Sequence, residues 1–324
     1  MISHILALWL ALVASAGAQA RWQSAQWADL PGWGEDAAEQ LWPQLRQQCT
    51  RPRPPWQAWC RELPPAPVDR LQAHAWLMAT LRPFRVGSEA PGLLTGYFEP
   101  ELAASRQPSE RFQVPLLRPD GRPLLYLDDA VDAMLLQVQG SGRVRLVEAD
   151  GREQLRRVAW AGDNRQPFRS MARWLVEQGA LREGQASWSA VRAWLVHHPE
   201  RLAELRAANP RVVYFREEPL PDPDTGPRGA MGWPLTPERS VAVDPRAVPH
   251  GTLLWLDSTR PAPGGKGGEP LRRLVLAQDS GSAIVGPVRA DFFWGWGEEA
   301  FAQAGRTQQP LRWWALWPKE APTP

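Results

Sequence analysis

The stretch AQDSGSAIVGPVRADFFWGWGEEA, Ala277–Ala300, carries two aspartates separated by a segment that contains glycine and proline. The aromatic residues that follow the second aspartate, Asp291, are Phe292, Phe293, Trp294 and Trp296. A carboxyl group held against aromatic rings is poorly solvated, so its neutral form is favoured and its pKa rises. Such a group can protonate a leaving oxygen near neutral pH. Asp291 is therefore the candidate general acid, and the aromatic side chains beside it suit the C–H face of a sugar ring.

Two other aspartates of the C-terminal region stand in a similar context. Asp279 belongs to LVLAQDSGSAIVG and Asp244 to SVAVDPRAVPHG. Like Asp291, each is expected at a strand end or in a turn rich in Gly and Pro. Turn aspartates commonly accept hydrogen bonds from their own backbone, and this is the alternative role for each of the three. The aromatic neighbours distinguish Asp291 from the other two.

Short strands dominate the pattern on both sides of these aspartates. The predicted strands are Leu93–Phe98, Arg143–Glu148, Gln154–Trp160, Arg211–Arg216, Val241–Val243, Leu253–Leu256, Leu271–Ala277 and Arg312–Trp317. Apolar residues at helical spacing predict helices in Glu35–Gln48, Val68–Leu81, Phe168–Glu177 and Ser187–Val196. The strands are too short and too unevenly connected for a regular βαβ succession, so we predict a mainly β chain with N-terminal helices. Pro219–Gly229, rich in Pro, Asp and Gly, is a candidate domain junction.

The composition limits the classes of function. The 324 residues are 44% hydrophobic and 22% charged, which is enough for one large or two medium domains. A net charge of +2 without a block of Lys or Arg argues against nucleic-acid binding. The 19 Trp residues can fill a core or stack on flat ligand faces, and composition does not separate these two uses.

The N-terminal sequence indicates the cellular compartment of the protein. Ile5–Ala16, ILALWLALVASA, is apolar but too short to span a bilayer, and Ala18–Ala20 fits the small-residue rule of a cleavage site. We therefore expect a cleaved signal peptide at residues 1–20 and a periplasmic protein, with an ordinary buried helix as the alternative. No Cys stands near the expected cleavage point to accept a lipid. In an oxidising compartment Cys49 and Cys60, on either side of the turn RPRPPW, are expected to form a disulfide.

Motifs of nucleotide and metal chemistry are missing from the sequence. It contains neither GxxxxGK[ST] nor a GxGxxG that opens a helix after a strand, and none of its five His residues has HExxH or similar spacing. Gln139–Arg143, QGSGR, superficially matches a serine nucleophile elbow, but Val138 replaces the first Gly of GxSxG. We therefore expect no metal and no cofactor.

Five segments follow one another as they do in a known family. They are LLTGYFEPEL (Leu93–Leu102), DAVDAMLLQVQGSGRVRL (Asp129–Leu146), NPRVVYFRE (Asn209–Glu217), GWPLTPERSVAVDPRAVPHGTLLWL (Gly232–Leu256) and Ala277–Ala300. In order and spacing they resemble the membrane-bound lytic murein transglycosylase A family, MltA, and the three aspartates resemble those of its C-terminal 3D module. The resemblance runs from about Leu93 to Pro318.

This resemblance implies a fold of two β-domains. The first is a double-psi β-barrel built from N- and C-terminal segments, residues 21–104 and 220–324. The second is a smaller β-domain inserted between them, residues 105–219, with the saccharide groove in the cleft between the two domains.

The resemblance also implies an activity and its residues. It implies a lytic exotransglycosylase, a lyase that cleaves the β-1,4 bond between N-acetylmuramic acid (MurNAc) and N-acetylglucosamine (GlcNAc) of peptidoglycan and leaves a 1,6-anhydro-MurNAc end. Asp291 takes the place of the single catalytic aspartate, with Asp279 as its charge-stabilising partner and Asp244 in a structural role. Candidate saccharide contacts are Gly96, Tyr97, Gln137, Gln139, Ser141 and Trp294, although Tyr97 and the two Gln could equally be core or turn groups. The implied partners are glycan strands and proteins of cell-wall synthesis or division.

Two departures from the family and two alternatives remain. Gly281-Ser282 replaces the usual Gly-Gly, and the lipid-acceptor Cys of well-known members is absent. A glycoside hydrolase on the same barrel would need a second carboxylate to activate water, either Glu99 or Asp279. A murein-binding protein without turnover is the other alternative, and the released product end distinguishes all three.

Overall fold

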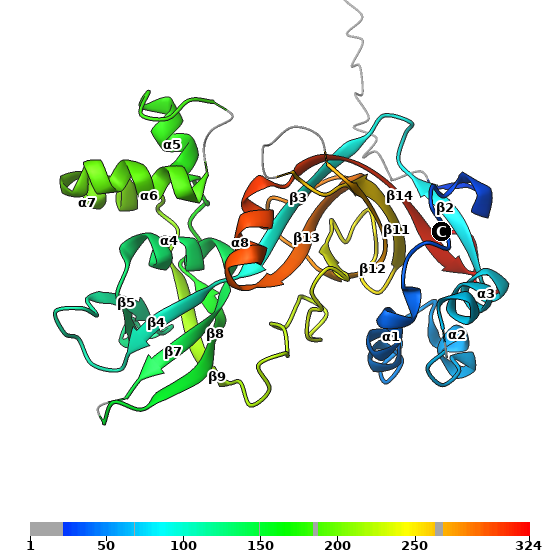
Figure 1. The fold of residues 1–324 in the computed structure, drawn as a ribbon, viewed down its shortest axis with the longest axis horizontal. Helices are drawn as coiled ribbons and strands as arrows, with labels where there is room; N and C mark the ends of the chain where they lie inside the picture. Colours follow the sequence, from blue (N-terminus) through cyan, green and yellow to red (C-terminus); the bar gives the residue numbers. More distant parts are fainter. Residues whose placement is uncertain (1–21, 68, 149, 184–186, 263–267) are drawn as a thin grey trace, which may run out of the picture.

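The computed structural model describes residues 22–67, 69–148, 150–183, 187–262 and 268–324. In this part of the chain a β-barrel lies beside a second, smaller sheet that carries its own helices (Figure 1). The predicted signal peptide, residues 1–20, lies outside the described residues. Among the helices that the structure describes, none has the length and apolar character needed to cross a bilayer.

The barrel is built from both ends of the described chain. Its sheet has the order β1 (Trp22–Ser24), β2 (Leu81–Val86), β14 (Gln308–Pro318), β11 (Leu253–Thr259), β12 (Pro270–Asp279), β10 (Ser240–Ala242), β13 (Arg289–Trp296) and β3 (Gly92–Glu99). β3 also pairs with β14, so the six strands from β14 to β3 close on themselves. The pairs β10–β12 and β3–β13 are parallel. The predicted mainly β fold, with a barrel made from N- and C-terminal segments, is confirmed.

Alternation along the strands separates the inside of the barrel from its outer face. Leu254 and Leu256 of β11 pack in the barrel core with Trp313 of β14. Their neighbours Leu253 and Trp255 point the other way, into a second apolar cluster. The strand wall is therefore buried on both sides where helices cover it.

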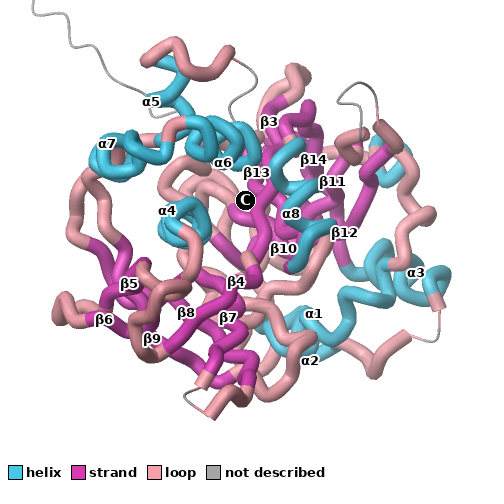
Figure 2. Tube along the Cα trace, turned by 60° about the vertical axis from the view of Figure 1, so that its left-hand side comes forward, coloured by secondary structure: helices cyan, strands magenta, loops and turns pink. Residues whose placement is uncertain are grey.

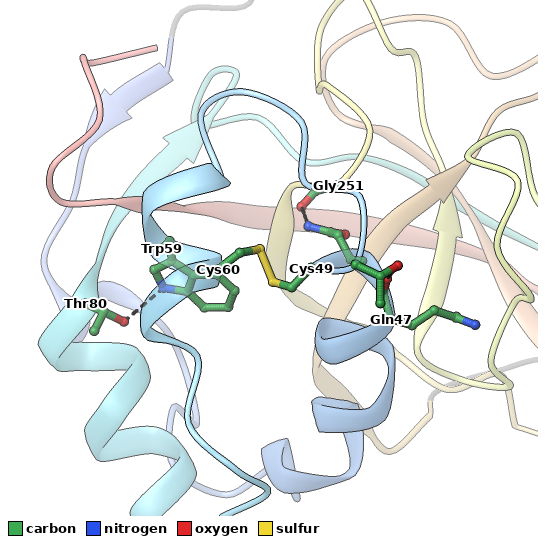
Figure 3. The surroundings of a disulfide bond; sticks show 8 residues. Gln47, Cys49, Trp59, Cys60, Thr80 and Gly251 are labelled. Atoms are coloured by element: carbon green, nitrogen blue, oxygen red, sulfur yellow. Dashed lines mark hydrogen bonds between the residues drawn. A yellow bond between two sulfur atoms is a disulfide. The ribbon is translucent and has the colours of Figure 1, made fainter.

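Those helices come from the N-terminal region, as predicted. They are η1 (Trp27–Asp29), η2 (Ala38–Leu41), α1 (Trp42–Gln48), α2 (Gln57–Glu62) and α3 (Arg70–Thr80). A disulfide between Cys49 and Cys60 joins the end of α1 to α2 (Figure 3). Next to it the buried Gln48 donates a hydrogen bond from Nε2 to the carbonyl oxygen of Gly251 at 3.0 Å. The disulfide thus fastens α1 to α2, and the Gln48 hydrogen bond connects this helical layer to the loop that leads into β11.

The second sheet has the order β5 (Val114–Leu117), β6 (Pro123–Leu127), β4 (Glu101–Ser105), β7 (Ser141–Val147), β8 (Glu153–Asp163) and β9 (Val213–Pro219). The chain enters this sheet at Pro100, slightly before the expected boundary at residue 104, because β4 already pairs with β6 and β7. It leaves after β9 through the predicted junction Pro219–Gly229. We therefore propose that the inserted unit extends from Pro100 to Pro219.

Helices cover one side of the second sheet and the seam between the two sheets. They are α4 (Ala130–Gln139), α5 (Met171–Glu177), α6 (Trp188–His197), η3 (Pro199–Arg201), α7 (Leu202–Ala207) and α8 (Gly297–Arg306). α4 packs Leu136 against the second sheet and Met134 against α5, α6 and α7. α8 follows β13 directly and lies beside the barrel strands, where it faces α4 and α6 (Figure 2). The sequence patterns did not predict α4, α8 or β13.

Candidate active site

Three neighbouring barrel strands bring two of the aspartates together. β10 lies between β12 and β13, and its Ala242 is in register with Asp279 on one side and Asp291 on the other. Both aspartates line one cleft with Ala242, whose short side chain keeps that cleft open between them. Asp291 therefore lies within a strand, not at the strand end or turn that the sequence predicted.

The carboxyl group of Asp291 is half-buried and held from the neighbouring strand. Its Oδ1 accepts a hydrogen bond from Oγ1 of Thr95 at 2.6 Å, and Thr95 stands directly opposite on β3. The Thr95 hydroxyl in turn accepts a hydrogen bond from Nη1 of Arg289 at 2.9 Å. Arg289 precedes Asp291 by two positions, so both side chains lie on the same face of β13.

These surroundings set the acidity of Asp291. Burial raises its pKa to about 6, and the negative charge of Asp279 adds to the rise. The hydrogen bond from Thr95 and the positive charge of Arg289 lower the pKa. Because burial dominates, the group can hold its proton in mildly acidic solution and exchange it near neutrality.

Asp279 is more firmly tied to the protein. Its Oδ2 accepts a hydrogen bond from the Tyr97 hydroxyl at 2.9 Å, and its Oδ1 accepts one from the backbone N–H of Ala230 at 2.9 Å. Its carbonyl oxygen lies 3.2 Å from Nε2 of His250. Burial raises the pKa of Asp279, while these donors oppose the rise. Asp279 therefore orders Tyr97 and the loop at Ala230 around the cleft.

Asp244 has a different environment. Its buried carboxylate accepts hydrogen bonds from Nε of Arg246 at 3.0 Å, from Nη2 of Arg246 at 2.9 Å and from the N–H of Gly286 at 2.9 Å. These donors hold the pKa of Asp244 well below its usual range. The residue joins the turn after β10 to the loop before β13, a geometry that suits the structural role predicted for it.

The cleft at the two aspartates opens into a longer groove between the barrel and the second sheet. The cleft at the two aspartates has a volume of about 330 Å³. A second hollow of about 510 Å³ shares Tyr97, Gln139 and Asp279 with it and continues along the second sheet past Trp160. A groove of this size can hold several rings of an extended ligand.

Four of the six predicted saccharide contacts line this groove. Gly96, Tyr97 and Gln139 line the cleft at the two aspartates, and Ser141 lines the hollow beyond it. Gly96 also leaves room for a core side chain, because a Cβ there would lie 2.5 Å from Nε1 of Trp294.

The structure does not bring Gln137 and Trp294 into the groove. Oε1 of Gln137 accepts a hydrogen bond from the N–H of Val213 at 2.9 Å, which ties α4 to β9. Trp294 is buried in the barrel core, where its Nε1 donates to Oγ1 of Thr307 at 2.9 Å. Strand alternation explains this, because Trp294 is three positions from Asp291 and faces the opposite side of β13.

Glu99 is not available as a water-activating base. It is buried and forms ion pairs with Arg143 at 3.0 Å and Arg157 at 2.5 Å. Both guanidinium groups also donate to the carbonyl oxygen of Thr225. This buried network joins the end of β3 to the second sheet and to the junction segment, so Asp279 remains as the second carboxylate for a hydrolase.

Sequence reasoning missed three residues of the site, namely Thr95, Arg289 and Trp160. Thr95 and Arg289 contact each other across β3 and β13, a pairing that no local pattern predicts. Arg289 could have been found from its position two residues before Asp291, because residues two apart on a strand share a face. Trp160 was assigned only to a strand end, but it is 51% exposed and lines the groove.

The assembled site offers one type of chemistry most directly. It holds a carboxyl group with a pKa near 6 at an open cleft, next to a second carboxyl that is anchored by its own donors. Such a group can give a proton to an oxygen in the cleft and later take one back. Among the residues that the structure describes, no three His, Cys, Asp or Glu side chains gather as a metal site requires.

Two family models match the chain. The MltA specific insert domain matches residues 117–216, which include most of the second sheet. The 3D domain matches residues 239–317, which include the barrel strands around Asp244, Asp279 and Asp291.

Similar proteins extend the likeness to most of the chain. The membrane-bound lytic murein transglycosylase A of Vibrio cholerae is 29% identical in an alignment 287 residues long, and the match covers 78% of this chain and 76% of that protein. Among solved structures, the lytic transglycosylase LtgG of Burkholderia pseudomallei is 40% identical, covers 94% of this chain and 97% of its own, and has a TM-score of 0.66. MltA of Escherichia coli with bound chitohexaose is 25% identical and has a TM-score of 0.69, and the match covers 93% of this chain and 92% of that one.

Proposed function

Because the chain belongs to the membrane-bound lytic murein transglycosylase A family, we propose that it cleaves the β-1,4 bond between MurNAc and GlcNAc of peptidoglycan and forms 1,6-anhydro-MurNAc. The observation that carries this proposal is the carboxyl group of Asp291, whose pKa is raised to about 6 within the groove. The chitohexaose bound to the Escherichia coli relative supports a glycan strand as the occupant of the groove.

In the proposed reaction Asp291 is the only residue that transfers a proton. It first protonates the glycosidic oxygen as the bond from that oxygen to C1 of MurNAc breaks. It then accepts the proton of the C6 hydroxyl of the same sugar as the bond between O6 and C1 forms. No water is consumed, so one carboxyl group suffices where a hydrolase needs two.

The substrate supplies its own nucleophile, which favours the reaction. Attack by a hydroxyl of the same sugar is intramolecular and benefits from a high effective molarity. The protein has to hold the ring with O6 near C1 and keep Asp291 protonated before bond cleavage. Asp279 contributes to the second task, because its negative charge raises the pKa of Asp291.

The proposed surroundings of the enzyme follow from the substrate. Peptidoglycan lies in the cell envelope, and the expected signal peptide at residues 1–20 would deliver the protein to the periplasm. We propose glycan strands as its ligand and proteins of wall synthesis or division as its partners.

Product analysis tests the proposal. Purified peptidoglycan is incubated with the protein, and the released muropeptides are weighed by mass spectrometry. We expect ends that are lighter by one water than their reducing counterparts. Reducing ends would instead support a hydrolase that uses Asp279 to activate water, and binding without any product would support a murein-binding protein.

A further inference from the structure

A separate pocket opens next to the catalytic cleft. It has a volume of about 350 Å³ and is lined by residues of α4, α6 and α8. Figure 2 shows these three helices where the two sheets meet. The rings of Phe98 and Phe301, with centroids 5.3 Å apart, line both this pocket and the catalytic cleft, as does Trp188. We call it the seam pocket. A ligand in the cleft can therefore place a substituent in the seam pocket without crossing the groove.

The seam pocket carries charges that the protein leaves available. Arg145 of β7, Glu101 of β4 and Glu298 of α8 line it and are exposed. Within the described part of the chain, these three side chains form neither an ion pair nor a hydrogen bond. Arg192 in the same wall is different, because its guanidinium is paired with Asp129 and Asp132.

Within the described residues, one unpaired arginine and two unpaired glutamates in the same pocket favour a ligand with charges of both signs. Arg145 suits a carboxylate, and the two glutamates suit an ammonium group. Phe98, Trp188 and Phe301 supply an apolar floor for short aliphatic side chains. A glycan strand without substituents offers no ammonium group, so the sugar chain alone does not account for the charges of this pocket.

We propose that the seam pocket binds the short peptide that MurNAc carries on its lactyl group. This peptide contains carboxylates and, where a diamino acid is present, an ammonium group. It is attached to the same sugar whose C1 reacts at Asp291, so it leaves the catalytic cleft beside the reacting bond. The proposal rests on the proposed function and specifies its substrate as peptide-bearing strands.

Matched substrates test the proposal. Peptide-bearing strands are compared with strands from which an amidase has removed the peptides, using the full protein and the variants Arg145→Ala, Glu298→Gln and their combination. We expect kcat/KM on peptide-bearing strands to fall about fivefold to tenfold for each lost charge contact. The value on peptide-free strands should stay within about twofold of the unmodified protein. Arg118→Ala, an exposed change before β6, is the control and should alter neither value.

The outcomes separate this proposal from the proposed function. If the variants cut both substrates as the unmodified protein does, or lose activity on both equally, the seam pocket does not bind the peptide. If neither substrate yields an anhydromuramic end, the proposed function itself fails. An NMR titration with free L-Ala-γ-D-Glu-diaminopimelate gives a second readout, in which shifts of the Trp188 indole should weaken in the double variant.

Discussion

The raised pKa of Asp291 has an effect on stability as well as on catalysis. Its pKa of about 6 in the folded protein exceeds the ordinary value of 3.8, so ionising it opposes folding. The stability that its protonated form contributes is complete below pH 3.8 and is lost as the pH rises through 6. The side chain is only half-buried, so we place the loss at about 1–2 kcal/mol, below the full value for two pKa units.

Asp291→Asn should therefore abolish product formation and make the protein more stable. Relative to the unmodified protein, we expect the free energy of unfolding to rise by about 1–2 kcal/mol at pH 8 and to change little at pH 4. Urea unfolding at both pH values measures this. Asp244→Asn is the matched control, for which we expect a change in stability of the opposite sign. The pKa of Asp244 is lowered in the folded protein, so removing its charge should decrease the free energy of unfolding at pH 8. Residual activity of Asp291→Asn within tenfold of the unmodified protein would remove Asp291 from its proposed role.

Thr95 should tune the same carboxyl group. Its hydrogen bond at 2.6 Å lowers the pKa of Asp291, so Thr95→Val should raise that pKa further. The alkaline limb of kcat/KM, where the acid form of Asp291 is lost, should then move to higher pH. Thr95→Ser retains the hydroxyl and should keep the original profile. An unshifted limb in Thr95→Val would show that this hydrogen bond does not set the acidity.

The close packing of β3 on β13 depends on a glycine. A Cβ on Gly96 would lie 2.5 Å from Nε1 of Trp294 and 2.9 Å from Oγ1 of Thr307. Gly96→Ala should therefore lower the free energy of unfolding by about 1–3 kcal/mol, because the barrel core cannot accept the methyl group. Chemical unfolding measures the loss. Gly305→Ala in α8 should instead be neutral or slightly stabilising, because a Cβ there would meet no atom within 4 Å apart from its chain neighbours and the backbone of its own helix. Equal losses for both variants would contradict this account.

Elements with a clear pattern were predictable, and the others were not. β11 and β12 read as strands because apolar residues and turns delimit them. β13 was missed because Phe292–Trp296 is a continuous aromatic run interrupted by Gly295, without alternation. α4 was missed because it is apolar on two faces, one for the sheet and one for the neighbouring helices. The pairing of Thr95 with Asp291 depends on strand register over a separation of 196 residues, which local patterns do not encode.

The disulfide lies in the helical layer on the outer face of the barrel, away from the groove. Cys49 and Cys60 close a short loop between α1 and α2 on the outer face of the barrel. Replacing both with Ser should lower the free energy of unfolding by about 3 kcal/mol and the melting temperature by several degrees. The product should stay the same, because neither residue lines the groove. An unchanged melting temperature would show that the bridge adds no stability.

The barrel closes only when β3 pairs with β13 and β14, which come near the end of the chain. The site is therefore complete only after these last strands have been made. As the nascent chain emerges, Thr95 and Tyr97 are made early, whereas Asp279 and Asp291 follow only after the entire second sheet. A partly synthesised or truncated chain therefore has half a site and no acid. The proposed wall-cutting activity therefore requires the C-terminal strands β13 and β14 to be present and paired with β3.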